Sequence, residues 1–298
     1  MERKNSKVKE DKNVRVKALE QFRKILMKNP KIKNVQTDDE FLLRFLRTKN
    51  FSVPDAMHLL ENYLSTHKRF PRLFMDLSAD LGDFTGLADA TFLYVLPQTD
   101  KKGRLVLFCV IKNFNIKQWT LEDFLRYANL AFEYLSLDER SQTNGVVQVV
   151  DFREESVGFF TQCTPSRIVE FSKCWQNTFP LCIQEIYFIG LPSYAESCLQ
   201  IFKIFLGEKL KGVVKVSKNW KEVSKEVGLS IFPKEFGGKT PAAQINKQYK
   251  KSLLEAKKEI LSVNQMDISL KKTVSFGKTY DIDLDKEIVV NFLKILSD

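Results

Sequence analysis

Strand-like and helix-like segments alternate along the middle of this 298-residue chain, and the alternation restricts the folds open to it. Two apolar segments flank a Lys102-Gly103 turn and predict a pair of neighbouring strands. Helical patterns are expected at 121–137, 165–176, 193–206 and 220–227, with strand patterns between them at 146–152, 184–190 and 211–216. Strands that alternate with helices predict a largely parallel sheet with helices packed on it, so the fold class is α/β.

Helical patterns without strands precede this region and predict a small helical bundle over residues 13–75. Thr37 is expected to cap its second helix and Ser52 its third, because a short hydroxyl side chain satisfies amide groups at a helix start. The rest of the chain divides into an α/β domain at 85–242 and a C-terminal helix and tail at 243–298.

The helix expected at 193–206 is apolar around most of its circumference, whereas a surface helix carries an apolar stripe of roughly 100°. Its apolar residues are Tyr194, Ala195, Cys198, Leu199, Ile201, Phe202, Ile204, Phe205 and Leu206. The surplus requires a second apolar partner besides the core. A fully buried helix, a lipid-like ligand beneath the helix and a bilayer beside it all satisfy this requirement.

Three further faces are apolar at the spacing of their elements. They comprise Leu125, Ala128, Asn129, Phe132 and Leu135 on one helix, Phe171, Cys174, Trp175 and Thr178 on another, and Val146, Gln148 and Val150 on a strand. These faces fit the walls of an apolar cavity, and a filled core gives the same periodicity. Asn129 is a polar amide on an apolar face, so it bonds a backbone group or meets the polar head of a ligand.

The net charge of +10 is concentrated at the start of the chain. Residues 1–33 hold twelve Lys and Arg against four Asp and Glu, which indicates a solvated tail, a nucleic-acid arm or an anchor to an acidic membrane. A second basic run lies at 203–225 and indicates either a contact with anionic lipid or a solvated face. Nucleic acid is a poor fit as a partner, because neither an RNA-binding signature nor a major-groove helix is evident.

Patterns typical of catalysis are missing from the sequence. His58 and His67 lie in the helical bundle, far from any plausible nucleophile, and GxSxG, HExxH, P-loop and GxGxxG patterns are absent. Asp151 ends a strand without a recognisable partner and is interpreted as a cap or loop anchor. We therefore expect no enzyme activity, no metal and no cofactor.

The cysteine pattern and the hydropathy bear on the compartment. Five cysteines without a CxxC pattern, four of them in apolar runs, indicate buried thiols in a reducing compartment. The charged N-terminus lacks the apolar region of a signal peptide, and no window of 18 uncharged apolar residues predicts a membrane span. The expected location is the cytoplasm.

Taken together, the chain resembles the CRAL-TRIO lipid-binding family over residues 35–240, in the branch of the α-tocopherol transfer protein, cellular retinaldehyde-binding protein and clavesins. The segments that carry the resemblance are DDEFLLRFLRTKNFSVPDAMHLL (38–60), NGVVQVVDF (144–152), Thr164-Pro165, TFP (178–180), IYFIGLP (186–192), FKIFL (202–206) and FPKEFGG (232–238). Their order and spacing match the family's.

The resemblance implies a cytosolic carrier that encloses one hydrophobic molecule and associates transiently with membranes. The helix at 193–206 would be a mobile gate over the ligand pocket. The positions implied to contact the ligand are Leu125, Ala128, Asn129, Phe132, Val146, Val150, Phe171, Cys174, Trp175, Phe179 and Ile183, with Leu199 and Phe202 on the gate helix.

The resemblance also implies an anionic-lipid headgroup site, with Arg47, Lys209, Lys211 and Lys215 as its candidates. In the tocopherol and retinaldehyde branch, basic residues after the TFP motif help to hold a phosphoinositide, but Cys182 and Gln184 stand here, and Gly212 replaces a family arginine. A regulatory module that binds phosphoinositide or a protein without cargo is the alternative function. Retinoid, tocopherol, another isoprenoid, sterol and phospholipid all demand an apolar pocket, and the pocket volume and the polar contact at Asn129 or Gln148 are expected to separate them. The oligomeric state stays open.

Overall fold

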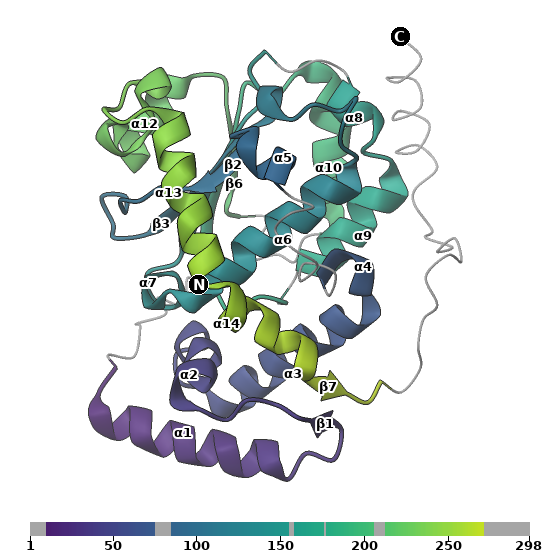
Figure 1. The fold of residues 1–298 in the computed structure, drawn as a ribbon, viewed down its shortest axis with the longest axis vertical. Helices are drawn as coiled ribbons and strands as arrows, with labels where there is room; N and C mark the ends of the chain where they lie inside the picture. The colour runs from purple at the N-terminus through teal and green to yellow at the C-terminus, as the bar shows by residue number, and fades with distance from the viewer. Residues whose placement is uncertain (1–9, 75–84, 155–157, 176, 206–211, 271–298) are drawn as a thin grey trace.

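The protein is described from a computed structural model, which covers residues 10–74, 85–154, 158–175, 177–205 and 212–270 (Figure 1). Its centre is a sheet of five strands among these residues, in the order β2-β3-β4-β5-β6. Their bounds are Leu93–Val95, Leu105–Val110, Val146–Asp151, Ile183–Ile189 and Val214–Ser217. β2 pairs antiparallel with β3 across the predicted hairpin, and the other pairs are parallel. The predicted α/β fold with a mostly parallel sheet is confirmed.

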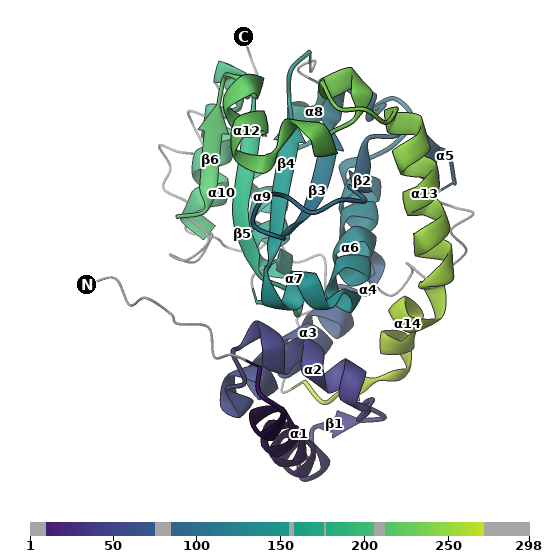
Figure 2. The ribbon, with the colours of Figure 1, turned by 90° about the vertical axis from the view of Figure 1, so that its left-hand side faces the viewer.

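The central strands β3 and β4 are buried along their whole length, as near-continuous apolar strands of a parallel sheet are. One face of the sheet is covered by α6 (Leu121–Leu137), α8 (Gly158–Thr161), α9 (Pro165–Trp175) and α10 (Glu196–Phe205). The other face is covered by α12 (Trp220–Val227) and the turns that follow it, η4 (Leu229–Ile231) and η5 (Lys234–Phe236) (Figure 2). The short elements α5 (Thr85–Asp89), η2 (Ile111–Asn113), α7 (Glu139–Thr143) and η3 (Ser193–Ala195) complete the domain.

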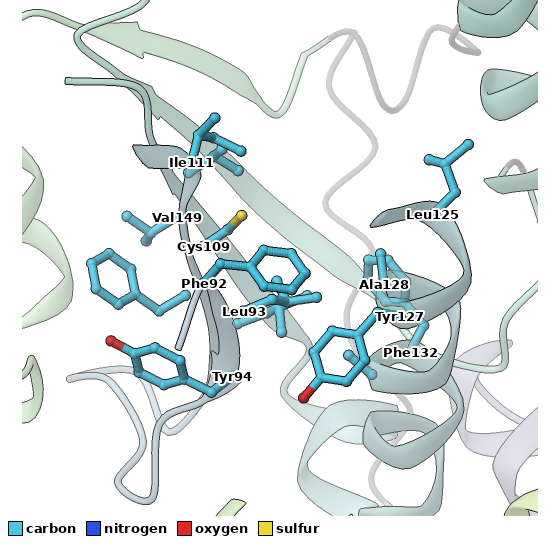
Figure 3. Packing of buried hydrophobic residues seen from close by; sticks show 14 of the residues in the cluster. Phe92, Leu93, Tyr94, Cys109, Ile111, Leu125, Tyr127, Ala128, Phe132 and Val149 are labelled. Atoms are coloured by element: carbon cyan, nitrogen blue, oxygen red, sulfur yellow. The ribbon is translucent and has the colours of Figure 1, made fainter. Parts of the chain in front are cut away.

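The largest core lies between α6 and the hairpin strands. Phe92 and Tyr127 are fully buried there, with ring centroids 5.4 Å apart. Figure 3 shows three members of this cluster on α6, with Leu125 set apart from Ala128 and Phe132. The start of α6 is fixed by a capping box, in which Thr120 and Asp123 each bond the other's backbone amide. The helix therefore places its first turns and its later turns in different surroundings.

The helical module contains α1 (Lys12–Met27), α2 (Asp39–Thr48), α3 (Val53–Arg69) and α4 (Pro71–Phe74). The predicted cap at Thr37 is wrong by one residue: Asp38 is the N-cap, because its carboxylate accepts the amide of Phe41 at 2.9 Å. Ser52 stands at the N-cap of α3 as predicted, but its side chain makes no capping bond.

The C-terminal segment returns to this module. The single C-terminal helix predicted within residues 243–298 is instead two helices, α13 (Ala242–Glu255) and α14 (Lys257–Leu261), separated at Ala256. After the turn η6 (Ser262–Gln265), β7 (Asp267–Ile268) pairs antiparallel with β1 (Ile32–Lys33). Val263 and Met266 are buried in the core of the bundle, so the segment up to residue 270 is part of that module's packing. Residues 271–298 lie outside the described chain.

Candidate functional site

An apolar cavity of about 140 Å³ lies between the sheet and the helices α6, α8, α9 and α10. The strands contribute Gln148, Val150, Ile186 and Phe188, and η2 and the loop after β4 contribute Ile111 and Phe152. The helices and their connections contribute Leu121, Phe124, Leu125, Phe159, Phe160, Cys163, Arg167, Ile168, Phe171, Trp175, Leu191, Ala195, Cys198, Leu199 and Phe202. Apart from Gln148, Arg167 and the two cysteines, these lining side chains are hydrophobic.

The sheet floor of the cavity follows from strand periodicity and register. Gln148 and Val150 are two residues apart on β4 and point to the same face. In the parallel pairing with β5, Gln148 lies beside Ile186 and Val150 beside Phe188. Four side chains from adjacent strands therefore form one contiguous patch under the helices.

Aromatic rings form much of the remaining wall. Phe160 lies 5.3 Å from Phe152 and 5.5 Å from Phe159, ring centroid to ring centroid. Phe171 of α9 stacks on Phe202 of α10 at 5.9 Å, so this pair joins the two helices at the edge of the cavity. Such ring contacts are worth about 0.5–1.5 kcal/mol each beyond area burial. They add to the burial of Cys198, Leu199 and Phe202, through which α10 packs on the core.

The turn before α10 has a constrained backbone. Gly190 has a φ of +63°, and a Cβ built on it would lie 2.4 Å from Cγ of Arg153. Only glycine fits this position, since both the positive φ and the close approach exclude a side chain. Leu191 follows directly and lines the cavity, so the turn and the cavity wall are continuous.

Six of the sequence-predicted ligand contacts line this cavity: Leu125, Val150, Phe171, Trp175, Leu199 and Phe202. The side chains of Ile201, Ile204 and Phe205, which contributed to the apolar surplus of the predicted gate helix, lie outside what the structure describes.

The other predicted contacts lie elsewhere in the core. Ala128 and Phe132 belong to the cluster beneath the later turns of α6, and Cys174 is buried beside the cavity without lining it. Phe179 packs on Phe132 with ring centroids 5.2 Å apart. Val146 and Ile183 pair with each other at the amino ends of their strands.

Most of the predicted contacts that do not line the cavity lie at the opposite end of the strands from it. The cavity lies toward their carboxyl ends, where Phe152 and Leu191 follow β4 and β5 and where the first turns of α6 begin. Residues at the other end of the strands and of α6 share the same face but do not reach it.

Asn129 has a structural role in this conformation. Its amide nitrogen donates to the carbonyl of Leu73 at 3.1 Å, and its oxygen accepts from the indole of Trp175 at 3.4 Å. Of the two alternatives open from the sequence, the backbone bond is the one observed.

Several aromatic lining residues were missed. Phe124, Phe159 and Phe160 come from the start of α6 and from α8, a helix that sequence periodicity did not predict. The abundance of phenylalanine, 24 residues in the chain, was the available signal for a large apolar interior, but it does not say which rings face the cavity.

The predicted headgroup residues are paired with carboxylates where the structure describes them. Arg47 is nearly buried and contacts Glu10 at 3.0 Å, Glu139 at 3.1 Å and the side-chain oxygen of Gln142 at 3.2 Å. Lys215 bonds Glu185 at 2.7 Å and donates to the hydroxyl of Tyr187 at 3.2 Å. Lys209 and Lys211 lie outside the described residues.

A polar hollow of about 320 Å³ lies at the amino ends of the strands, lined by Lys102, Arg104, Asn144, Gln184 and Glu185. Burial alone would raise the pKa of Glu185, but hydrogen bonds from Lys215 and Arg104 outweigh it and lower the pKa. The hydrogen bond to Glu185 raises the pKa of Lys215. Lys102, Arg104 and Lys215 around this hollow all contact Glu185, and Arg104 also contacts Asp100, so each positive group already has a carboxylate partner within the protein.

The remaining polar candidates are structural. Asp151 accepts the backbone amide of Arg153 at 3.1 Å and pairs with its guanidinium at 2.9 Å, so it anchors the loop after β4 as expected. None of the five cysteines forms a disulfide, and burial raises the pKa of the Cys198 thiol to about 11. Across the described ranges, no group of His, Cys, Asp and Glu is arranged to hold a metal ion. No described helix has the length and hydrophobicity needed to cross a bilayer.

Two family models match the chain: one described as CRAL/TRIO domain over residues 89–238, and one described as CRAL/TRIO, N-terminal domain over residues 18–62. Clavesin-1 of Xenopus laevis is 30% identical over 225 residues, which cover 75% of this chain and 68% of that protein. Clavesin-2 of Homo sapiens is 29% identical with the same coverages, and clavesin-1 of Rattus norvegicus is 29% identical over 63% of its length. The chain thus matches about two thirds of the length of these relatives.

Among solved structures, a crystal structure of Sfh5 matches with a TM-score of 0.53 at 16% sequence identity. The match covers 85% of this chain and 99% of that one. At this level of identity the likeness shows a shared fold.

Proposed function

The chain belongs to the CRAL-TRIO family of lipid-binding proteins, and we propose that it is a non-enzymatic carrier that binds one small hydrophobic ligand and exchanges it at membranes. The observation that carries the proposal is the apolar cavity between the sheet and α10. An aromatic and aliphatic lining with very few polar groups suits a lipophile and lacks the groups that a covalent reaction needs.

The driving force for binding follows from area. A lipophile that buries about 400 Å² of apolar surface gains about 10 kcal/mol at about 25 cal/mol per Å², before the costs of association. The same hydrophobicity makes release into water slow, so a carrier must meet a membrane to load and unload.

For a carrier, the size of the cavity requires a moving gate. A volume of about 140 Å³ is close to that of an engineered cavity of about 150 Å³ that holds benzene. A retinoid, tocopherol or comparable lipid is much larger, so the wall must move to admit it. We assign that movement to α10, which contributes Cys198, Leu199 and Phe202 to the wall and contacts α9 through the stacked ring pair.

The membrane contact is proposed to be electrostatic. Lys203 on α10 is partly exposed, and the basic N-terminal segment adds charge that attracts anionic lipid. We retain Arg47, Lys209, Lys211 and Lys215 as the proposed contacts of a phosphoinositide or other anionic headgroup. For Arg47 and Lys215, such contact requires the headgroup to compete with the carboxylates they already bind. Peripheral association of a cytoplasmic protein is the corresponding location.

The alternative function is a regulatory module that binds phosphoinositide or a protein and carries no cargo. The small cavity is the observation that favours it, since a cavity that never enlarges holds no lipid of ordinary size.

The experiment that separates the two functions begins with purified protein. Lipids are extracted into organic solvent and identified by mass spectrometry, before and after incubation with mixed vesicles. The extracted lipid is then placed in donor vesicles, and its passage to acceptor vesicles is timed with and without protein. A stoichiometric lipophile whose transfer the protein accelerates supports the carrier. Protein that stays empty after the incubation contradicts it and favours the regulatory module.

A further inference from the structure

Gln148 is a buried amide on the floor of the apolar cavity. It lies in the middle of β4, between Leu107 of β3 and Ile186 of β5 in the sheet register. The residue is only 8% exposed and lines the cavity together with Val150. Its side-chain oxygen Oε1 is fully buried and accepts no hydrogen bond from any residue that the structure describes.

Most buried polar atoms in proteins have a hydrogen-bond partner. Oδ1 of Asn246 is also buried without one, but Asn246 does not line the cavity, whereas Gln148 does. The cavity offers an internal comparison. Asn129, the nearby buried amide outside the cavity, has both its nitrogen and its oxygen paired. Gln148 therefore holds an acceptor for which the described protein supplies no donor.

The other charged or amide side chain of the lining is differently placed. Arg167 is exposed at the surface, and its guanidinium donates to the carbonyl of Gln162 at 3.3 Å. A ligand head at Arg167 would stay near water, whereas a head at Gln148 would be surrounded by Val150, Ile186 and aromatic rings. The two residues thus define two different ligand orientations, and only the Gln148 orientation supplies the missing donor.

The chemistry of the amide selects the ligand head. A primary amide presents one acceptor oxygen and one donor nitrogen side by side. A hydroxyl group donates to the oxygen and accepts from the nitrogen, so it satisfies the amide in either of its two flipped orientations. An ether, aldehyde, ester or ionised carboxylate head supplies only acceptors, so in either orientation it pairs with the amide nitrogen alone and gives the amide oxygen no donor. A hydrocarbon supplies neither.

Resting on the carrier function proposed above, we propose that Gln148 is the headgroup-recognising residue of the cavity. The ligand is a neutral lipophile with one hydroxyl group, which enters hydroxyl-first and forms a hydrogen bond with Gln148. Specificity of this kind comes from the penalty for leaving the amide unpaired. It rejects analogues without the hydroxyl more strongly than shape alone does.

The test compares matched lipids in one vesicle mixture. Delipidated full-length protein is incubated with equimolar hexadecanol, hexadecyl methyl ether and palmitic acid, and with phytol, phytyl methyl ether and phytanic acid. The lipids that stay with the re-isolated protein are quantified by mass spectrometry. We expect each alcohol to be retained at least about tenfold over its ether and acid, since one unpaired buried polar group corresponds to that factor or more.

Two variants assign the effect. In Gln148→Leu the preference for the alcohol disappears, while the melting temperature stays the same or rises because the unpaired amide is gone. Asn129→Leu is the matched control: it loses two hydrogen bonds and lowers the melting temperature, but keeps the preference for the alcohol. Gln148→Leu therefore loses the preference for the alcohol without a lower melting temperature, and Asn129→Leu lowers the melting temperature without losing the preference.

The contradicting outcomes are distinct. Equal retention of alcohol, ether and acid, or a preference that persists in Gln148→Leu, overturns the role of Gln148 and leaves the carrier function standing. A preference for the acids that Arg167→Gln abolishes overturns it as well, since the head then lies at the surface. Retention of none of the six lipids also overturns the role of Gln148, and the carrier function then depends on the extraction and transfer experiment described above.

Discussion

The contact between the helical module and the α/β domain rests on a buried polar network whose energy is measurable. Glu133 of α6 is 2% exposed and lies 2.9 Å from Nε2 of His67, and the hydroxyl of Tyr63 donates to its other oxygen at 2.9 Å. Nδ1 of His67 lies 2.7 Å from the carbonyl oxygen of Tyr63, which only accepts, so Nδ1 carries a proton. The network joins α3 to the helix whose first turns line the cavity.

Replacement of His67 by leucine removes one partner of a buried pair and leaves the Glu133 carboxylate with Tyr63 alone. Breaking a buried pair in this way costs about 3–5 kcal/mol, because the remaining charge stays desolvated. For a protein of this size that corresponds to a fall in melting temperature of roughly 6–20 °C. Adding Glu133→Gln to the same variant removes the charge and keeps an acceptor for Tyr63, so it should restore more than about 1 kcal/mol.

The assay is urea unfolding followed by tryptophan fluorescence for the wild type, His67→Leu, and His67→Leu with Glu133→Gln. His58→Leu serves as the control, because His58 lies exposed on the same helix. A loss below about 1 kcal/mol for His67→Leu refutes the reasoning, as does a double variant no more stable than the single one.

Three further outcomes are expected. Burial raises the pKa of Cys198 to about 11, so iodoacetamide should modify this thiol slowly at pH 8. If α10 opens at a membrane, anionic vesicles should accelerate the modification of Cys198, and a rate that does not change relative to that of Cys182 contradicts a moving gate. Lys203→Glu should slow lipid transfer from anionic vesicles several-fold without changing the amount of bound ligand, whereas Lys251→Glu, at an exposed position of α13, should leave the transfer rate unchanged. Equal slowing by both variants would mean that net charge, and not the position on α10, determines the transfer rate. Because the pKa of Glu185 is lowered on folding, its ionised form stabilises the fold above pH 4.5, the ordinary pKa of glutamate, and this contribution is lost as the pH falls through the lower folded pKa. Glu185→Gln should therefore lower the melting temperature at pH 7 and weaken the fall of the melting temperature below pH 4.5, measured as melting temperature against pH.

Much of the fold was predictable because local patterns and the overall architecture agree. The Lys102-Gly103 turn predicts a pair of neighbouring strands, and the alternation of strands and helices after it predicts a largely parallel sheet, as observed. The structure adds that the first strand of the pair, β2, lies antiparallel at the edge of the sheet. The cap at Asp38 was missed because Thr37 and Asp38 are both good N-cap residues, and only the backbone geometry decides between them. The separation of α13 from α14 at Ala256 has no glycine or proline to signal it.

The sequence predicts which faces of the strands and helices are apolar, but not which end of those faces lines the cavity. Periodicity identifies which side of a strand or helix is apolar, so Val150, Leu125 and Phe171 were found together with Val146 and Phe132 on the same faces. Which end of those faces encloses space depends on how far α10 lies from the sheet, and residue spacing carries no information about that distance. Gln148 shows the same limit: its alternation was visible in the sequence, but its unpaired oxygen required the packed structure.

The most direct test of the carrier account is the mass of the protein after it meets lipid. Delipidated wild type, Cys198→Trp and Leu254→Trp are incubated with mixed vesicles, re-isolated and weighed by native mass spectrometry. Cys198→Trp fills the cavity, and Leu254→Trp adds the same ring at an exposed position of α13. The account predicts one bound lipid per chain in the wild type and in Leu254→Trp, and none in Cys198→Trp. A wild type without bound lipid, or a Cys198→Trp variant that binds as much as the wild type, would contradict it.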